Sequence, residues 1–300
     1  MDRRLGLAAG ATLTIFSVLL APACGGSDYV DAADAGPEAL PDALPDAHAN
    51  DATSGEGGSP DADASTKADA DASFDAEAGL DSGTQGLLTT LGTAAPFVVL
   101  GGATVTNSGI STVLEGDVGT TGPSITGLTG KPFQPTGNTE INDAKAIKAV
   151  ADLSTAYVAL TAKPCPPANN LTGLDLGGMT LAPGVYCFSS SAGQISATTL
   201  TFDAKGDPNA VWIIQVATAL TVMDNAHAIV IGGPASLACR IFWTTGTAAT
   251  LNANVEYVGN FLASSTTTLL TNARLAPGRA FGQVNGVTLL SNFVSAAACP

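Results

Sequence analysis

The sequence predicts a mostly β fold in which short strands stack in coils beside one long helix. From about residue 87 onward, short apolar runs alternate with Thr and Ser and are cut by Gly or Asn, a pattern typical of short strands that end in tight turns. Similar phrases return at irregular intervals, which indicates stacked structural units. The aromatic content is only 5%, which suits a narrow core built from Val, Leu and Ala.

The first part of this region, residues 87–126, is expected to form short strands. Three runs carry the expectation, and each ends at Gly or Asn: FVVLGG from Phe97, ATVTN from Ala103 and VLEGDVG from Val113. A loop rich in Gly, Pro and Thr follows, to about Glu140.

One segment, roughly 142–161, has the apolar spacing of a helix. Asn142 or Asp143 can cap it by accepting hydrogen bonds from free amide groups. Apolar residues recur at spacings of three and four and would form one stripe; they are Ala146, Ala149, Val150, Leu153, Ala156, Tyr157 and Leu160. Lys163-Pro164 closes the segment, because proline disfavours helical geometry in the residue before it. The stripe suits a structural helix that covers a sheet.

After Cys187 the chain returns to strands. Four threonines begin similar phrases at spacings of 29, 18 and 20 residues, and they are Thr221, Thr250, Thr268 and Thr288. Coils of this kind would stack about 4.8 Å apart, with inward Leu, Val and Ile forming the core. Trp212 and Trp243 lie in strongly apolar strands and are expected in the core or against the helix.

The first 24 residues are typical of an export signal. Arg3 and Arg4 precede an apolar stretch from Leu5 to Leu20, and small residues lead to Cys24. The stretch is shorter than a membrane-spanning helix requires. The end of the segment resembles a bacterial lipobox, so we expect a lipoprotein at the outer membrane or cell surface, anchored through Cys24. Ordinary cleavage and secretion is the alternative.

Residues 25–86 are expected to form an acidic, disordered tether. They contain 15 Asp and Glu residues against the single Lys67, and their only aromatic side chains are Tyr29 and Phe74. Such a segment cannot bury enough apolar area to offset the entropy of ordering. It is interpreted as a self-repelling spacer.

The net charge of -15 therefore lies mostly in the tether, and the domain at 87–300 is nearly neutral. Without a basic stripe or a polybasic patch, the domain is not expected to bind nucleic acid, nor to bind a membrane except through a lipid anchor at Cys24. We expect a monomer.

Four further cysteines indicate disulfides in an exported protein, and four cysteines allow three pairings. The preferred pairing joins Cys165 to Cys187, closing the loop after the helix, and Cys239 to Cys299, fastening the last coil to an inner one. A metal site is not expected, because no C-x₂-C spacing occurs and His227 is the only histidine of the domain.

Catalysis and cofactors are not expected either. No nucleophile-elbow, zinc-protease or phosphate-loop motif occurs. A catalytic triad would have to depend on His227 alone. The closest acidic pairs, Glu115 with Asp117 and Asp203 with Asp207, flank glycine and are explained by turns.

Several segments together resemble the ice-binding-protein-like family: LGTAAPFVVLGGATVT from Leu91, LDLGGMTLAPGVYCFSSSAG from Leu174, LTFDAKGDPNAVWIIQV from Leu200 and LAPGRAFGQVNGVTLLSN from Leu275. The resemblance covers most of 87–300. It implies an irregular right-handed β-solenoid (β-helix) with one long α-helix packed along its flank, carrying the chain from one end to the other. It also implies ice binding through a flat face that carries Thr-Gly/Ala-x-Thr/Asn phrases.

Aligned by their opening threonines, the coils offer four phrases: Asp224–His227, 253–256, 271–274 and 291–294. Asn occupies the second position throughout, which suits a left-handed turn conformation. The outer positions carry Asp224, His227, Glu256 and Arg274, whose hydration shells disfavour ice. We expect Glu256 and Arg274 to lie side by side in adjacent coils, within reach of an exposed ion pair.

A second, hydroxyl-rich surface is the better candidate for weak to moderate ice adsorption, because Thr holds a methyl and a hydroxyl in fixed rotamers. Its candidate residues are Thr198, Thr199, Thr201, Thr244, Thr245, Thr247, Thr250, Ser264, Ser265, Thr266, Thr267, Thr268 and Thr271. The alternative function is a cell-surface adhesin or envelope structural module that binds glycan or protein without ice activity.

Overall fold

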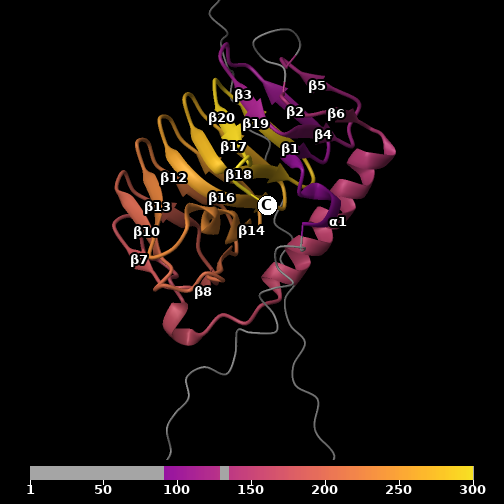
Figure 1. Cartoon of the computed structure of the whole chain (residues 1–300). Coiled ribbons are helices and arrows are strands. Elements are labelled where there is room, and N and C mark those ends of the chain that lie inside the picture. The colour runs from indigo at the N-terminus through magenta and orange to yellow at the C-terminus, as the bar shows by residue number, and fades with distance from the viewer. Residues whose placement is uncertain (1–90, 129–134, 300) are drawn as a thin grey trace, which may run out of the picture. The chain divides into compact units, whose positions relative to one another are not determined.

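A computed structural model describes residues 91–128 and 135–299. These residues form stacked coils of parallel strands with one α-helix along their flank (Figure 1). The fold class expected from the sequence, a mostly β solenoid with a flanking helix, is thus confirmed. The expected export signal at 1–24, with Cys24, and the tether at 25–86 lie outside the described residues.

One side of the solenoid is a seven-stranded parallel sheet, which we call the threonine face. In spatial order its strands are β5 (Ile125–Thr126), β2 (Thr104–Asn107), β19 (Gly286–Leu289), β17 (Thr266–Leu269), β15 (Ala249–Leu251), β12 (Leu220–Val222) and β9 (Gly193–Ile195). No pairing in this sheet has a register shift. The face is therefore regular from its first strand to its last.

A 13-stranded sheet forms the other two sides and bends between them. The bend lies within two long strands, β16 (Glu256–Ala263) and β18 (Arg274–Gly282). The register shifts there, between Tyr257 and Gly259. Gly259 has a φ of +99°, and a Cβ on it would lie 2.9 Å from Ile241, so this tight corner requires glycine.

The helix side of this sheet is made by the C-terminal parts of β16 and β18 with six further strands. These are β6 (Thr139–Ile141), β4 (Asp117–Thr120), β1 (Phe97–Gly101), β14 (Ile241–Thr245), β11 (Trp212–Val216) and β8 (Gly184–Phe188).

The charged side, named for the ionisable residues on it, is made by the N-terminal parts of β16 and β18 with five further strands. These are β3 (Val113–Glu115), β20 (Phe293–Ser295), β13 (His227–Ile231), β10 (Thr199–Asp203) and β7 (Thr180–Leu181).

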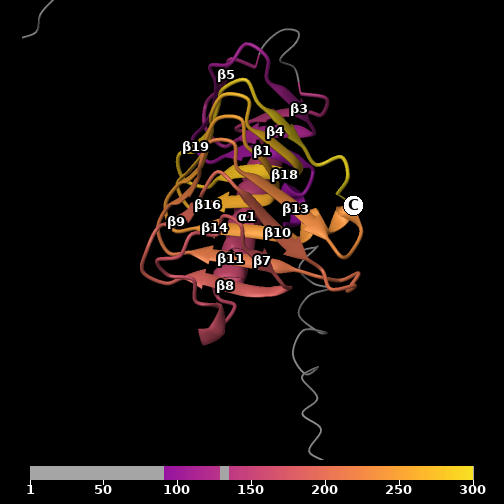
Figure 2. The ribbon, with the colours of Figure 1, turned by 90° about the vertical axis from the view of Figure 1, so that its left-hand side faces the viewer.

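The order of the coils in space differs from their order in the chain. Strand β1 pairs with β18 on one edge and with β4 on the other, so the first strands lie beside the last complete coil. The helix then carries the chain from the β4–β6 end to the β7–β9 end, and later coils stack back toward β1. Figure 2 shows this stack from β8 at one end to β5 at the other.

The helix, α1 (Ala144–Thr161), begins two residues later than the expected start, and Asp143 caps it. The Asp143 carboxylate accepts a hydrogen bond from the Ala146 amide at 2.8 Å. The predicted stripe is buried at Ala146, Ala149, Leu153, Ala156 and Leu160. It packs against apolar side chains of the helix side, including Phe97, Leu100, Ile213, Phe242, Leu262 and Phe281.

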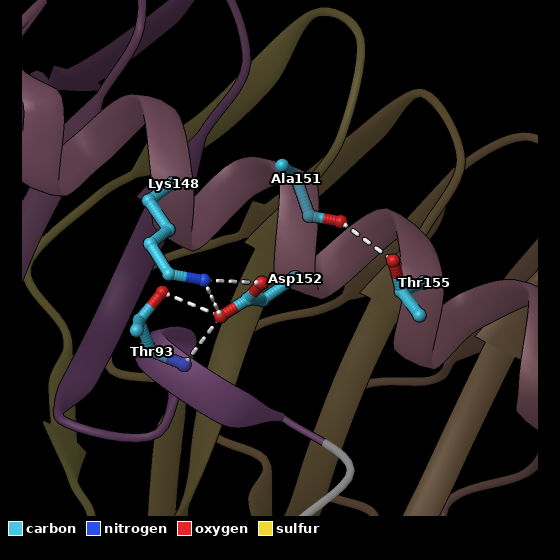
Figure 3. Close-up of polar contacts among 5 residues, drawn as sticks. All are labelled: Thr93, Lys148, Ala151, Asp152 and Thr155. Carbon is cyan, nitrogen blue, oxygen red and sulfur yellow. Dashed lines mark hydrogen bonds and ion pairs between the residues drawn. The ribbon is translucent and has the colours of Figure 1, made fainter.

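A short 3-10 turn, η2 (Gly92–Ala94), is fastened to the outer surface of α1 (Figure 3). The Asp152 carboxylate accepts from the Thr93 amide at 2.8 Å and from the Thr93 hydroxyl at 2.7 Å. Lys148, one turn earlier, donates to the same carboxylate at 3.0 Å. The hydrogen bond from the Thr93 amide is the main cause that lowers the pKa of Asp152 to about 2.

The aromatic residues are concentrated in the interior. Trp212 and Trp243 are fully buried, as expected, and their indole N–H groups donate to the carbonyls of Leu181 and Val258. Trp243 stacks on Phe261 with ring centroids 5.4 Å apart. Both tryptophans are therefore structural.

Two disulfides join Cys165 to Cys187 and Cys239 to Cys299, the expected pairing. The first ties the segment after α1, which includes η3 (Pro167–Asn169), to β8. The second ties η4 (Ala235–Arg240) to the residues after β20. The turn η4 also accounts for the unusual spacing of 29 residues between Thr221 and Thr250.

The run VLEGDVG, expected to be one strand, is two. Gly116 separates β3 on the charged side from β4 on the helix side. It has a φ of +147°, and a Cβ there would lie 2.5 Å from a Val98 methyl group, so the glycine permits the corner. Within the described residues, no helix has the length and apolarity to cross a membrane.

Candidate functional site

The candidate site is built on the threonine face by one unbroken column of threonines. Register pairs Thr221 with Thr250, Thr250 with Thr268, and Thr268 with Thr288. The column continues from Thr288 to Thr106 and from Thr106 to Thr126. Six of the seven strands thus contribute a threonine at one level, and Gln194 of β9 ends the row beside Thr221. The column joins strands from both ends of the chain.

Each threonine of the column faces outward because side chains alternate along a strand. Its neighbours on both sides point into the core: Leu220 and Val222 around Thr221, and Ala249 and Leu251 around Thr250, are buried. The threonines themselves are half-buried or exposed. A packed core therefore lies directly beneath the column and holds it in place.

A second outward column, two residues earlier in each strand, carries only small side chains. Register places Thr266 beside Gly286 and Gly286 beside Thr104. Ala248 and Ala219 stand at the same distance before Thr250 and Thr221. The hydroxyl oxygens of Thr104 and Thr106 lie 3.1 Å apart. No side chain in this second column is larger than threonine.

The threonine face carries no ionisable residue in any of its seven strands. Neighbouring coils lie about 4.8 Å apart, and alternate residues along a strand lie about 6.6 Å apart. Because no strand is bulged, the hydroxyl and methyl groups form a regular two-dimensional array. The arrangement offers a regular and uncharged pattern of small groups.

Three predicted residues, Thr250, Thr266 and Thr268, belong to this array. Thr247, Ser264 and Ser265 lie at its edge, in the turns that lead from the helix side to the threonine face. The backbone bonds from Thr247 to Thr218 and from Ser265 to Thr247 stack these turns regularly, at 3.0 and 2.9 Å. This part of the predicted set is brought together.

The other predicted residues are elsewhere. Thr267 points inward, is fully buried, and donates to the Phe281 carbonyl at 2.7 Å. Thr244 and Thr245 are buried in β14 beneath the helix. Thr199 and Thr201 lie in β10 on the charged side, with Thr198 just before it.

Thr271 is in the turn after β17. The prediction was wrong in treating every nearby hydroxyl as part of one surface, because strand alternation and coil corners divide them.

The charged residues stand on a different side from the threonine column. Register pairs His227 with Glu256 and Glu256 with Arg274, as the phrase alignment predicted. His227 Nδ1 and the Glu256 carboxylate lie 3.7 Å apart and form an ion pair when His227 is protonated, while the Arg274 guanidinium lies 4.0 Å from the centroid of the Phe293 ring. Asp224 lies in the preceding corner, where it accepts from the Ala253 amide at 2.8 Å. The predicted pairing of Glu256 with Arg274 is replaced by these contacts.

The corner between the two sides explains the recurring asparagine. Asn225, Asn254 and Asn272 have φ values of 60°, 56° and 60°, as the left-handed turn requires. In the last coil Ser291 takes this position, with a φ of 56°, and Asn292 is buried. The alignment of the fourth phrase, 291–294, was therefore wrong by one residue.

Sequence reasoning omitted Thr104, Thr106, Thr126, Thr221 and Thr288 from the site. The signal was present, since Thr221, Thr250, Thr268 and Thr288 open similar phrases, and their predicted correspondence is confirmed by register. The phrases Thr218–Thr221 (TALT) and Thr247–Thr250 (TAAT) end at the column. The threonine face is formed by the start of each phrase. The four-residue segments that were aligned come later in the chain, after the corner that leads from the threonine face to the charged side.

Two open cavities lie away from the threonine face. One, of about 410 Å³, is at the corner beside the charged side and is lined by Asn254, Glu256, Arg274 and Phe293 among others. The other, of about 370 Å³, is lined by Arg279 and Glu115 among others. Among residues 91–128 and 135–299, no three His, Cys, Asp or Glu side chains gather to hold a metal ion.

Comparison with known proteins agrees with this architecture. Residues 99–295 match the family model described as Ice-binding-like. An ice-binding protein of Nostoc sp. (strain HG1) is 42% identical over 208 residues, which cover 69% of this chain and 74% of that protein. An ice-binding protein of Flavobacterium frigoris (strain PS1) is 32% identical over 228 residues, covering 72% and 79%.

Solved structures give the same result. The crystal structure of an ice binding protein from an Antarctic biological consortium superposes with a TM-score of 0.63 at 37% identity, covering 68% of this chain and 90% of that one. The structure of an ice-binding protein from the Antarctic ascomycete Antarctomyces psychrotrophicus has a TM-score of 0.61 at 35% identity, covering 68% and 96%.

Proposed function

Because the chain belongs to the ice-binding-like family, we propose that it adsorbs to ice through the threonine face. The family consists of ice-binding proteins, and the chain is not an enzyme. The observation that carries the proposal is the in-register column of Thr221, Thr250, Thr268, Thr288, Thr106 and Thr126.

Ice recognition requires a rigid surface that orders water in a lattice-like pattern. A threonine in a strand presents a methyl group and a hydroxyl in a restricted rotamer, and the column repeats this pair at each coil. Charged groups would hold water in liquid-like shells, and the strands of this face carry none. The charged residues that argued against ice, Asp224, His227, Glu256 and Arg274, do not belong to it. These features support adsorption by the whole sheet.

The phrases of this face also fit the family pattern. TALT at 218–221 and TAAT at 247–250 have the Thr-Ala-x-Thr form, and NGVT at 285–288 keeps the glycine and the final threonine. Alanine and glycine at the second position leave room between threonine columns for water. This agreement supports the same face as the ice-contacting one.

We also propose the setting in which this activity operates. The export signal at 1–24 and the lipobox-like end at Cys24 support a surface lipoprotein, with the acidic segment 25–86 as its spacer. Such an anchor would hold a cell against ice. Secretion without an anchor is the alternative, and mass spectrometry of the N-terminal peptide, from protein of the native cell envelope and of the medium, distinguishes a lipid-modified Cys24 from an unmodified one.

The second candidate function is binding of glycan or protein without ice activity. It is favoured by the open cavity beside the charged side, where Glu256, Arg274 and Asn254 offer hydrogen bonds next to the Phe293 ring. A glycan partner would contact these residues and leave the threonine face free.

Ice recrystallisation inhibition by the full chain tests the proposed function. The test variant changes Thr250 and Thr268 to Tyr, which places two rings on neighbouring strands of the face. The matched control changes Thr199 to Tyr, an exposed threonine on the charged side. We expect inhibition by the native chain and the control, and loss of inhibition in the folded double variant. Absence of inhibition by the native chain at micromolar concentration would contradict the proposal.

A further inference from the structure

A buried arginine lies at the corner between the charged side and the helix side. Arg279, in β18, is only 5% exposed. Its Nε donates to the Ala95 carbonyl at 2.8 Å, and its Nη1 donates to Asn260 Oδ1 at 2.8 Å. Both acceptors are neutral. No described carboxylate lies within the 4.0 Å that would form an ion pair with it.

The neighbours of Arg279 fix its orientation. Asn260 is itself buried, and its amide nitrogen donates to the carbonyls of Cys239 and Ile241 at 2.9 and 3.2 Å. The Asn260 oxygen is thereby turned toward Arg279. Nε and one Nη1 proton are occupied, and among residues 91–128 and 135–299 no acceptor is found for the rest of the five guanidinium protons that arginine carries.

Arg279 borders an open cavity of about 370 Å³, whose walls also include Glu115 and Cys299. Burial lowers the pKa of Arg279 to about 10, so the side chain stays charged at neutral pH. A buried charge that has no carboxylate in direct contact is costly, because neutral acceptors replace only part of the hydration it loses. The cavity therefore offers a desolvated cation to any anion that enters.

We propose that this cavity is a carboxylate-binding site in which Arg279 is the recognition group. A planar guanidinium fits a carboxylate in a two-pronged hydrogen-bonded pair. The cavity is separate from the threonine face, and the inference does not depend on ice adsorption.

Glu115 limits which carboxylates enter. Its carboxylate lines the same cavity and accepts from the Ser295 hydroxyl at 2.7 Å. Its negative charge repels an incoming anion, so removing that charge is a test of carboxylate binding. Replacing Glu115 by Gln retains an acceptor for Ser295 and removes the charge, so it should strengthen carboxylate binding without disturbing Arg279.

The carboxylate has two available sources. One is a small solute such as acetate. The other is the chain itself, since acidic residues precede Leu91, where the described region begins, and Ala95, whose carbonyl accepts from Arg279, is four residues after Leu91. Asp75, Glu77 and Asp81 are the acids closest in sequence to that point. A tethered group would act at a high effective concentration.

The test is an NMR titration of the full chain with sodium acetate at constant ionic strength, with sodium chloride as the control anion. We expect saturable shifts of signals around Arg279 with a dissociation constant on the order of millimolar, and no matching effect of chloride. Glu115→Gln should tighten binding roughly two- to fivefold. Arg279→Gln should abolish it, and its amide spectrum checks that the fold is retained.

A variant with Asp75→Asn, Glu77→Gln and Asp81→Asn separates the two sources. Tighter acetate binding than in the native chain would identify these acids as the resident carboxylates, and equal binding would identify a free solute. Absence of saturable acetate binding in the native chain, in Glu115→Gln and in this variant would overturn the proposal. The expected effect of Glu115→Gln is tighter acetate binding. This gain is measured independently of Arg279→Gln, so misfolding of the arginine variant cannot produce it.

Discussion

The threonine face and the charged side are built from the same coils and differ in what their outward columns carry. On the threonine face, register aligns threonine with threonine over six strands. On the charged side, the column that runs through His227, Glu256, Arg274 and Phe293 changes chemistry at every coil. Strands on both sides bury alternate residues in the core, so the difference between the sides lies in the residues that face outward.

The two sides do not differ in backbone regularity. The pairings within the threonine face and those within the charged side have no register shift, and the shift between Tyr257 and Gly259 lies at the corner between the charged side and the helix side. The difference is therefore in the side chains: a repeated array of threonines suits a crystalline ligand, and a charged surface that changes at every coil suits solvent or a molecular partner. Substitutions that exchange features between the two sides test whether this difference matters for ice adsorption.

The largest expected effect comes from placing a charge on the threonine face. Thr268→Lys puts an ammonium group in the middle of the column, between Thr250 and Thr288. We expect ice recrystallisation inhibition to require on the order of tenfold more protein, equivalent to about 1.4 kcal/mol of adsorption free energy. Thr199→Lys on the charged side is the control and should retain native activity. Equal losses in both would remove the distinction between the sides.

A smaller effect, on stability alone, is expected one residue away. Thr267 is buried, and its hydroxyl donates to the Phe281 carbonyl at 2.7 Å. Thr267→Val removes that hydrogen bond and should lower the free energy of unfolding by about 1 kcal/mol, measured by chemical denaturation. Ice activity should be unchanged. If Thr267→Val lost as much ice activity as Thr268→Lys, the outward direction of the Thr268 side chain would not explain the role of Thr268 in ice adsorption.

A third effect concerns the helix side and appears only in acid. The pKa of Asp152 is lowered to about 2, first by the Thr93 amide. Its contribution to stability is therefore complete above the ordinary pKa near 4 and is lost as pH falls toward 2. Asp152→Asn should lower the melting temperature at pH 7 by a few degrees and flatten the loss of stability between pH 4 and 2. Parallel pH profiles for the two proteins would exclude this role.

The smallest effect is expected from neutralising the charged side. Changing Glu256 and Arg274 together to Thr removes the His227 ion pair and the contact with Phe293, both at the surface. Exposed pairs contribute about 0–1 kcal/mol, and ice activity should change less than twofold. A large gain in ice activity would show that this side contacts ice once its charges are removed.

The sequence predicted the elements of the fold better than the site. The stripe from Ala146 to Leu160 and the cysteine pairs depend on local spacing and simple loop closure, and both were correct. The opening threonines Thr221, Thr250, Thr268 and Thr288 were also matched correctly, although the residues after Thr288 were aligned one position too late. These signals are local, so a single sequence carries them.

The site was harder to predict because a residue belongs to it only if it lies on the right side of the solenoid and points outward. Three consecutive residues of β17, Thr266, Thr267 and Thr268, are all threonine, yet Thr267 is buried and only Thr266 and Thr268 face water. Thr244 and Thr245 are excluded because they lie in β14, a strand of the helix side in which every residue is buried. Thr106 and Thr126 join the column because the first coils stack against the last, a long-range pairing that no local pattern reveals.

The most direct test of ice adsorption through the threonine face is the partition of the fluorescently labelled full chain into a slowly growing ice hemisphere. The variant changes Thr106 and Thr288 to Tyr, at the junction where the N-terminal strand β2 meets β19, and Thr199→Tyr is its control. The account predicts that the native chain and the control enter the ice and that the folded double variant stays in the liquid. Exclusion of the native chain, or entry of the double variant at the native level, would contradict it.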